Sequence, residues 1–169
     1  MAVGYHSISA TRVLAVLVTA IAPVAAAATP AAAQSPEMSF FLVLTGPARG
    51  ADRPELEVSD THCRTIAYAQ GFGHLTWRAY LDGSPAAGQG TIKARDRIGR
   101  GPWHNYHGVL IAESVAQLHS DDNNLWHESA ATATGELAPA GAIEIPWGSE
   151  LDGSDFSRAG PFLCFGIPG

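Results

Sequence analysis

The chain has few basic residues, with 10 Lys and Arg against 16 Asp and Glu, and its formal net charge is −6. Proteins that bind nucleic acid or anionic lipid need a basic surface to neutralise phosphate groups. This composition therefore predicts neither kind of partner. A chain of 169 residues is long enough to form one domain with a single hydrophobic core.

Several catalytic motifs are also missing. The sequence contains no Gly-x-Ser-x-Gly nucleophile elbow, no His-Glu-x-x-His pair and no Gly-rich phosphate loop after a predicted strand. These absences disfavour a serine hydrolase of that type, a zinc protease and a nucleotide-binding enzyme. The paired carboxylates of a glycosidase stay open, because that pair is defined by its separation in space.

There is one long apolar run, Val13–Ala28, and Arg12 is the only Lys or Arg before it. Small residues follow, and Ala31-Ala32-Ala33 offers an Ala-x-Ala cleavage site. This pattern predicts a secretory signal peptide over residues 1–33. The alternative is a retained membrane anchor, but Pro23 and the Ala-rich end match poorly the roughly 20 strongly apolar residues of a spanning helix.

Cleavage there would release a secreted or periplasmic protein with no membrane span. We expect a short exposed leader at residues 34–37 and one domain over residues 38–169. The two cysteines of the chain, Cys63 and Cys164, predict one disulfide in an oxidising compartment. The alternative is a pair of free buried thiols.

The pattern of apolar residues predicts a mixed domain. The apolar run 38–45 is typical of a strand buried on both faces. We expect Ser59 to cap a helix that ends near Gln70, with Asp60 in its first turn and Cys63 facing inward. Further elements expected are strands at 75–81, 109–111, 143–147 and 161–166, a helical turn followed by a tight bend within 94–103, and a helical turn at 113–119. This order predicts an α+β fold with an antiparallel sheet, flanking helices and long loops.

Five segments together resemble a known family. They are DTHC (60–63), TWRAYL (76–81), ARDRIG (94–99), GPWHN (101–105) and GVLIA (108–112). As a set they resemble bacterial secreted lectin-like proteins of C-type lectin-like fold, which is distantly similar to the endostatin domain of collagen. The resemblance implies that fold, and in it a cysteine of the first helix pairs with one of the final strand, as Cys63 and Cys164 would.

The chain departs from the family members that bind sugar through calcium. It lacks their Glu-Pro-Asn or Gln-Pro-Asp triplet and their Trp-Asn-Asp triplet. The second cysteine pair is missing, and residues 142–160 are short where those members carry a long loop. The resemblance therefore implies the fold without implying calcium-dependent sugar binding.

One loop combines acidic residues with a tryptophan. Carboxylate oxygens in a flexible loop suit calcium, and an exposed tryptophan ring can stack on a sugar. The candidate ligand-binding residues are Trp147, Glu144, Glu150, Asp152 and Asp155. The alternative is a solvated acidic loop with Trp147 packed against the core.

Three other polar clusters are interpreted as structural. Residues 121–124 (DDNN) are typical of a turn and lack the Gly and distal Glu of an EF-hand loop. The histidines of HNYH (104–107) have a spacing that binds zinc on a helix, but the glycines around them make a helix unfavourable. Asp96 is expected to pair with Arg95 or Arg97.

These observations favour an exported, non-enzymatic binding module with lectin-like recognition of a glycan or a protein at the cell envelope. One alternative is a small envelope hydrolase that uses loop carboxylates such as Glu144 and Glu150. Another is a purely structural or adhesive envelope component. The missing catalytic motifs disfavour the hydrolase.

Overall fold

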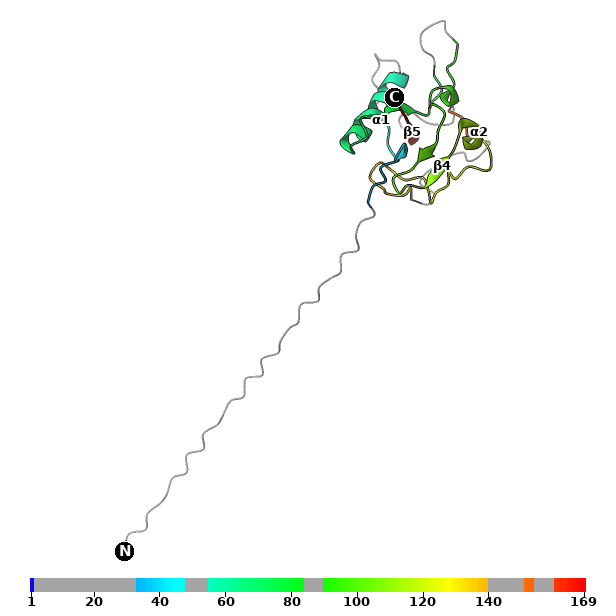
Figure 1. The fold of residues 1–169 in the computed structure, drawn as a ribbon. Helices are drawn as coiled ribbons and strands as arrows, with labels where there is room; N and C mark the ends of the chain where they lie inside the picture. The colour runs from blue at the N-terminus through cyan, green and yellow to red at the C-terminus, as the bar shows by residue number, and fades with distance from the viewer. Residues whose placement is uncertain (2–32, 48–54, 84–89, 140–150, 154–159) are drawn as a thin grey trace. The chain divides into compact units, whose positions relative to one another are not determined.

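The computed structural model describes residues 1, 33–47, 55–83, 90–139, 151–153 and 160–169. The chain from residue 31 onward forms one compact unit, drawn in Figure 1. Its elements are β1 (Phe40–Val43), α1 (Glu55–Ala69), β2 (Thr76–Ala79), the 3-10 helix η1 (Ala94–Asp96), β3 (Trp103–His104), β4 (Leu110–Ala112), α2 (Val115–Leu118) and β5 (Phe162–Ile167). The described unit is a mixed α/β structure with antiparallel sheets and few helices.

The main sheet has the strand order β1-β5-β2, and both pairings are antiparallel. The C-terminal strand β5 is therefore central, and in the view of Figure 1 it lies between α1 and α2. Cys164 lies opposite Phe41 on one side and Ala79 on the other. A second, two-stranded sheet pairs β3 with β4. The strands expected near 38–45, 75–81, 109–111 and 161–166 are confirmed.

Both faces of the main sheet are covered, which explains why β1 and β5 have no polar alternation. On one face the ring of Phe165 lies 5.1 Å from Phe40 and 5.1 Å from Trp103 of β3. On the other face Cys164 is bonded to Cys63 of α1. All of these residues are fully buried.

The disulfide between Cys63 and Cys164 is confirmed, and it joins α1 to the central strand across 101 positions of sequence. An intramolecular disulfide of this kind fits an oxidising environment outside the cytoplasm. No helix in the described part of the chain is long and apolar enough to cross a membrane.

Helix α1 begins one turn earlier than expected. Its first residue is Glu55, so Ser59 is not the N-cap, and Asp60 lies beyond the first turn. Glu57 lies in the first turn, where an acidic side chain is favourable to the helix dipole. The inward face is as expected, with Cys63 and Ala67 fully buried. Asp60 therefore lies inside the helix, where its side chain has a different role.

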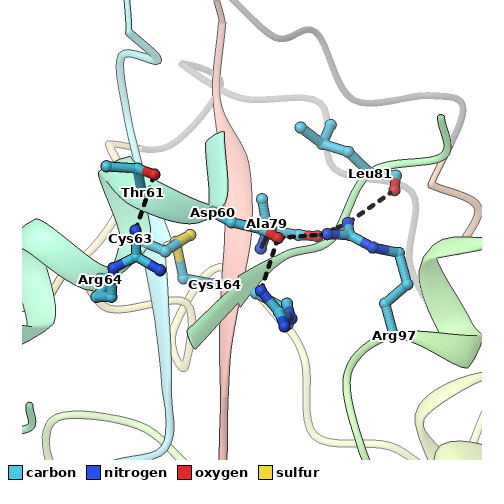
Figure 2. A network of polar contacts seen from close by, with 9 residues as sticks. Asp60, Thr61, Cys63, Arg64, Ala79, Leu81, Arg97 and Cys164 are labelled. Carbon is cyan, nitrogen blue, oxygen red and sulfur yellow. Dashed lines mark hydrogen bonds and ion pairs between the residues drawn. A yellow bond between two sulfur atoms is a disulfide. The ribbon is translucent and has the colours of Figure 1, made fainter. Parts of the chain in front are cut away.

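Asp60 joins α1 to the outer edge of β2 (Figure 2). Its carboxylate accepts hydrogen bonds from the backbone N–H of Ala79 (2.9 Å), from Nη1 of Arg78 (3.0 Å) and from Nη2 of Arg97 (2.6 Å). Arg97 also donates to the carbonyl of Ala79 at 3.0 Å. The partner of Arg97 is therefore Asp60 and not Asp96. The buried carboxylate of Asp60 also satisfies the backbone N–H of Ala79 on the edge strand β2.

The segment from Ala94 to Trp103 forms one helical turn and a tight bend, as expected. Gly99 and Gly101 have φ angles of 86° and 88°, which favour glycine. A Cβ at position 101 would lie only 2.7 Å from the carbonyl oxygen of Glu113. The bend directs Trp103 into the core beside β5.

The start of the domain is attached to the second sheet. Pro36 and Glu37 are exposed. The backbone N–H of Ser35, however, donates to the carbonyl of Tyr106 at 2.8 Å. The expected signal peptide lies outside the described residues except for Met1 and Ala33.

Candidate functional site

A polar cleft of about 510 Å³ opens where four segments meet. They are the segment 80–82 that follows β2, the segment 93–95 at the start of η1, the residue after α2, and the short segment 151–153. The lining residues are Tyr80, Asp82, Lys93, Ala94, Arg95, His119, Leu151, Asp152 and Gly153.

The inner end of the cleft contains a chain of hydrogen bonds through His119. Its Nδ1 lies 2.6 Å from the carbonyl oxygen of Val115, and its Nε2 lies 2.5 Å from the hydroxyl of Tyr80. A carbonyl can only accept, so Nδ1 carries a proton, and in the neutral ring Nε2 then accepts from the Tyr80 hydroxyl. This fixes the tautomer of a neutral imidazole. The Tyr80 hydroxyl also lies 3.4 Å from the carbonyl of Leu151.

Burial lowers the pKa of His119 below its ordinary value of 6.5. The hydrogen bond to the backbone of Val115 raises this pKa, the charge of Arg95 lowers it, and the charge of Asp152 raises it. Burial also lowers the pKa of His62 on α1, against a hydrogen bond to the backbone of Thr45. Both histidines are therefore neutral in the folded protein at neutral pH.

We expect the free energy of unfolding to fall as the pH falls through the histidine range. The unfolded chain takes up protons near its ordinary histidine pKa of about 6.5, whereas His119 and His62 of the folded chain resist protonation until a lower pH. Stability is thus fully present above that value and is lost below it. Urea unfolding at about pH 7.5 and about pH 5.5 measures the difference, and His119→Asn should reduce it. Equal midpoints at the two pH values would contradict the expectation.

Asp82 fixes the η1 side of the cleft. Its Oδ1 accepts from the backbone N–H of Ala94 at 2.8 Å, and its Oδ2 accepts from Nζ of Lys93 at 2.6 Å. The hydrogen bond to Asp82 raises the pKa of Lys93, and the negative charge of Asp82 raises it further. Nζ of Lys93 also lies 4.0 Å from Oδ1 of Asp152 across the cleft. Lys93 is therefore held between two carboxylates.

Gly153 lets the third segment approach closely. The backbone N–H of Asp82 donates to the carbonyl of Gly153 at 3.0 Å. A Cβ at position 153 would collide with the Cβ of Ala94 and would lie 2.5 Å from Oδ1 of Asp82. A side chain at this position would push residues 151–153 outward and change the cleft.

The exposed side chain of Arg95 lines the cleft from η1. Together the lining groups offer a guanidinium, an ammonium, carboxylates and backbone carbonyls rather than an apolar wall. Such a surface suits a polar ligand that forms several hydrogen bonds.

The structure describes only part of the expected site. Asp152 lines the cleft. Trp147, Glu144, Glu150 and Asp155 lie outside the described residues, as does the strand expected at 143–147. Among the described residues there is no group of three or more His, Cys, Asp or Glu side chains that could hold a metal ion. Calcium binding by this loop therefore stays an expectation.

The other clusters have structural partners. Asn123, in the acidic turn, is buried and donates to the carbonyls of Leu118 and Ser120. Nε2 of His107 lies 2.9 Å from the carbonyl of Gly135, and Nε2 of His104 lies 3.9 Å from Glu37. These contacts agree with the interpretation of both clusters as structural.

Sequence reasoning missed Tyr80, Asp82, Lys93, Arg95 and His119 as members of one site. Tyr80 carries the signal of a strand residue, and His119 comes at the end of an expected helical turn. A useful signal was available in the polar residues that directly follow predicted elements, because element ends bring loops together.

The comparisons with known proteins add no relative: no family model, no curated protein and no solved structure matches this chain.

Proposed function

We propose that the protein is an exported, non-enzymatic binding module that recognises a glycan or a protein ligand at the cell envelope, through a C-type lectin-like domain. The observation that carries the proposal is the polar cleft at the meeting point of the segments 80–82, 93–95 and 151–153. The disulfide supports export, because such bonds persist in oxidising compartments.

The hydrogen bonds that hold the segments around the cleft support a binding role. The segment 80–82 continues directly from β2, whose Ala79 is held by Asp60 and Arg97. Asp82 in turn fixes the backbone of Ala94. Binding loops are most effective when a rigid scaffold positions them, because less conformational freedom is lost on binding.

The alternative of a hydrolase depends on a carboxylate that can act as acid or base. Both oxygens of Asp82 are occupied by Lys93 and the backbone of Ala94, so Asp82 is held as a structural anion. The carboxylates Glu144 and Glu150 on which that alternative rested lie outside the described residues. The binding module is therefore the function that the described cleft supports best.

A glycan array probed with the exported domain, with calcium and with EDTA, tests the proposal. We expect bound glycans, and Gly153→Ala should weaken their binding by roughly tenfold or more, since it displaces one wall of the cleft. Gly90→Ala is the matched control, because a Cβ at position 90 meets nothing within 4 Å. Hits that survive EDTA assign binding to the described cleft, and hits lost with EDTA assign it to the acidic loop around Trp147.

An array without hits, together with no captured envelope protein, would contradict the binding function. Turnover of a glycoside by the same preparation would replace it with the hydrolase.

A further inference from the structure

We propose that the cleft binds a sugar that carries a carboxylate, and that Arg95 holds this carboxylate. The inference rests on the proposed function and makes it more specific, since it names the ligand class and the residue that selects it.

Arg95 differs from the other cations around it. Lys93 is paired with Asp82, and Arg97 is paired with Asp60. The side chain of Arg95 is exposed and makes no hydrogen bond or ion pair among the described residues. Its charge nevertheless acts within the cleft, because Arg95 helps to lower the pKa of His119.

The groups beside Arg95 have little capacity left for a charged ligand. His119 uses both ring nitrogens, one toward Val115 and one toward Tyr80. Asp82 uses both oxygens. The guanidinium of Arg95 therefore supplies the N–H donors that meet the ligand's charge. A guanidinium presents a planar fork that matches a carboxylate with two parallel hydrogen bonds.

The acidic side of the cleft does not favour a cationic ligand. Asp152 faces Nζ of Lys93 at 4.0 Å, so a fixed cation already lies opposite it. The chain as a whole is acidic, with a net charge of −6. The net negative charge of the protein would not attract an anionic ligand to this surface. Recognition of an anion must therefore come from its local contact with Arg95.

The size and polarity of the cleft suit a sugar ring. Its volume of about 510 Å³ lies within the range of about 300–1,000 Å³ of small-molecule sites. The buried residues Tyr80 and Leu151 line its inner end, and the exposed residues Lys93 and Asp152 line its rim. Hydroxyl groups of a sugar both donate and accept, so they can use a wall of this mixed kind.

The test compares two probes that differ in one group, methyl β-D-glucuronide and methyl β-D-glucoside, by NMR titration of the labelled domain. We expect the glucuronide to bind at least about tenfold more tightly, the effect of one charged hydrogen-bonded contact. Arg95→Gln should remove this preference, and Arg95→Lys should keep part of it. Arg64→Gln on α1 is the matched control, because Arg64 is an exposed arginine outside the cleft.

A second readout is the titration of His119. A carboxylate bound to Arg95 offsets the charge that lowers the pKa of His119, so glucuronide should raise that pKa and glucoside should not. Equal binding of the two probes in the wild type and in Arg95→Gln would overturn the inference and leave the proposed function intact. If no glycan binds at all, the inference fails, and the proposed function fails with it only when no envelope protein is captured either. Tighter binding of an acidic peptide than of glucuronide would also overturn it.

Discussion

Replacing Asp60 with alanine is expected to destabilise the protein by about 3–5 kcal/mol, the range for a buried charge that loses its partner. The side chain of Arg97 is only 11% exposed, and it would keep its charge without the carboxylate. The backbone N–H of Ala79 would lose its acceptor in the same step. Arg78 adds less, because its side chain is 38% exposed and water can replace the ion pair. Urea unfolding at neutral pH measures the change.

Two variants separate the charge from the hydrogen bond. Asp60→Asn can keep an oxygen acceptor for Ala79 while it removes the charge, so its effect should be intermediate. Asp96→Ala removes an exposed aspartate that has no ion pair among the described residues, and it should change stability by no more than about 0.5 kcal/mol. If Asp60→Ala and Asp96→Ala have the same effect, the network around Asp60 is not a determinant of stability.

The fold was predictable where it depends on local pattern. The apolar runs at β1 and β5, the turn and bend before Trp103 and the inward face of α1 all follow from residue spacing, and the structure confirms them. The predicted start of α1 was wrong, because Ser59 and Asp60 have the sequence pattern of a helix cap. In the structure Asp60 lies inside the helix and its carboxylate contacts β2. The ion pair between Asp60 of α1 and Arg97, the residue after η1, joins positions 37 apart, and no local pattern reports it.

The site was less predictable because its residues lie far apart in the sequence. The Tyr80 hydroxyl meets the carbonyl of Leu151 across 71 positions, and the cleft exists only when the segments near both residues are in place. Local composition singled out the acidic loop, of which Asp152 is the described member of the cleft. Arg95 belongs to a run that begins at Ala94 and is interpreted as structural from the sequence, and Lys93 directly precedes that run. Their different roles emerge only from their partners.

Removing the disulfide is expected to have an effect of similar size. Cys63 and Cys164 close a loop of 101 positions, and in the chain-entropy model opening such a loop costs about 4–5 kcal/mol of stability. The variant Cys63→Ala/Cys164→Ala should therefore unfold at a much lower urea concentration. Because the effect arises in the unfolded chain, which becomes less compact, the dependence of the unfolding free energy on urea should also become steeper. Mass spectrometry of unreduced peptides verifies the bond in the wild type.

A double-mutant cycle distinguishes loop closure from lost packing. Either single alanine variant opens the same loop, so each should lose nearly as much stability as the double variant. If packing were the main term, the two single losses would instead add, because each fully buried side chain would leave its own cavity. The sheet gives a reason to expect the first result. Cys164 sits on the central strand between Phe41 and Ala79, and strand pairing holds it in place with or without the bond. Additive losses with an unchanged urea dependence would show that the bond acts through the folded core and not through the unfolded chain.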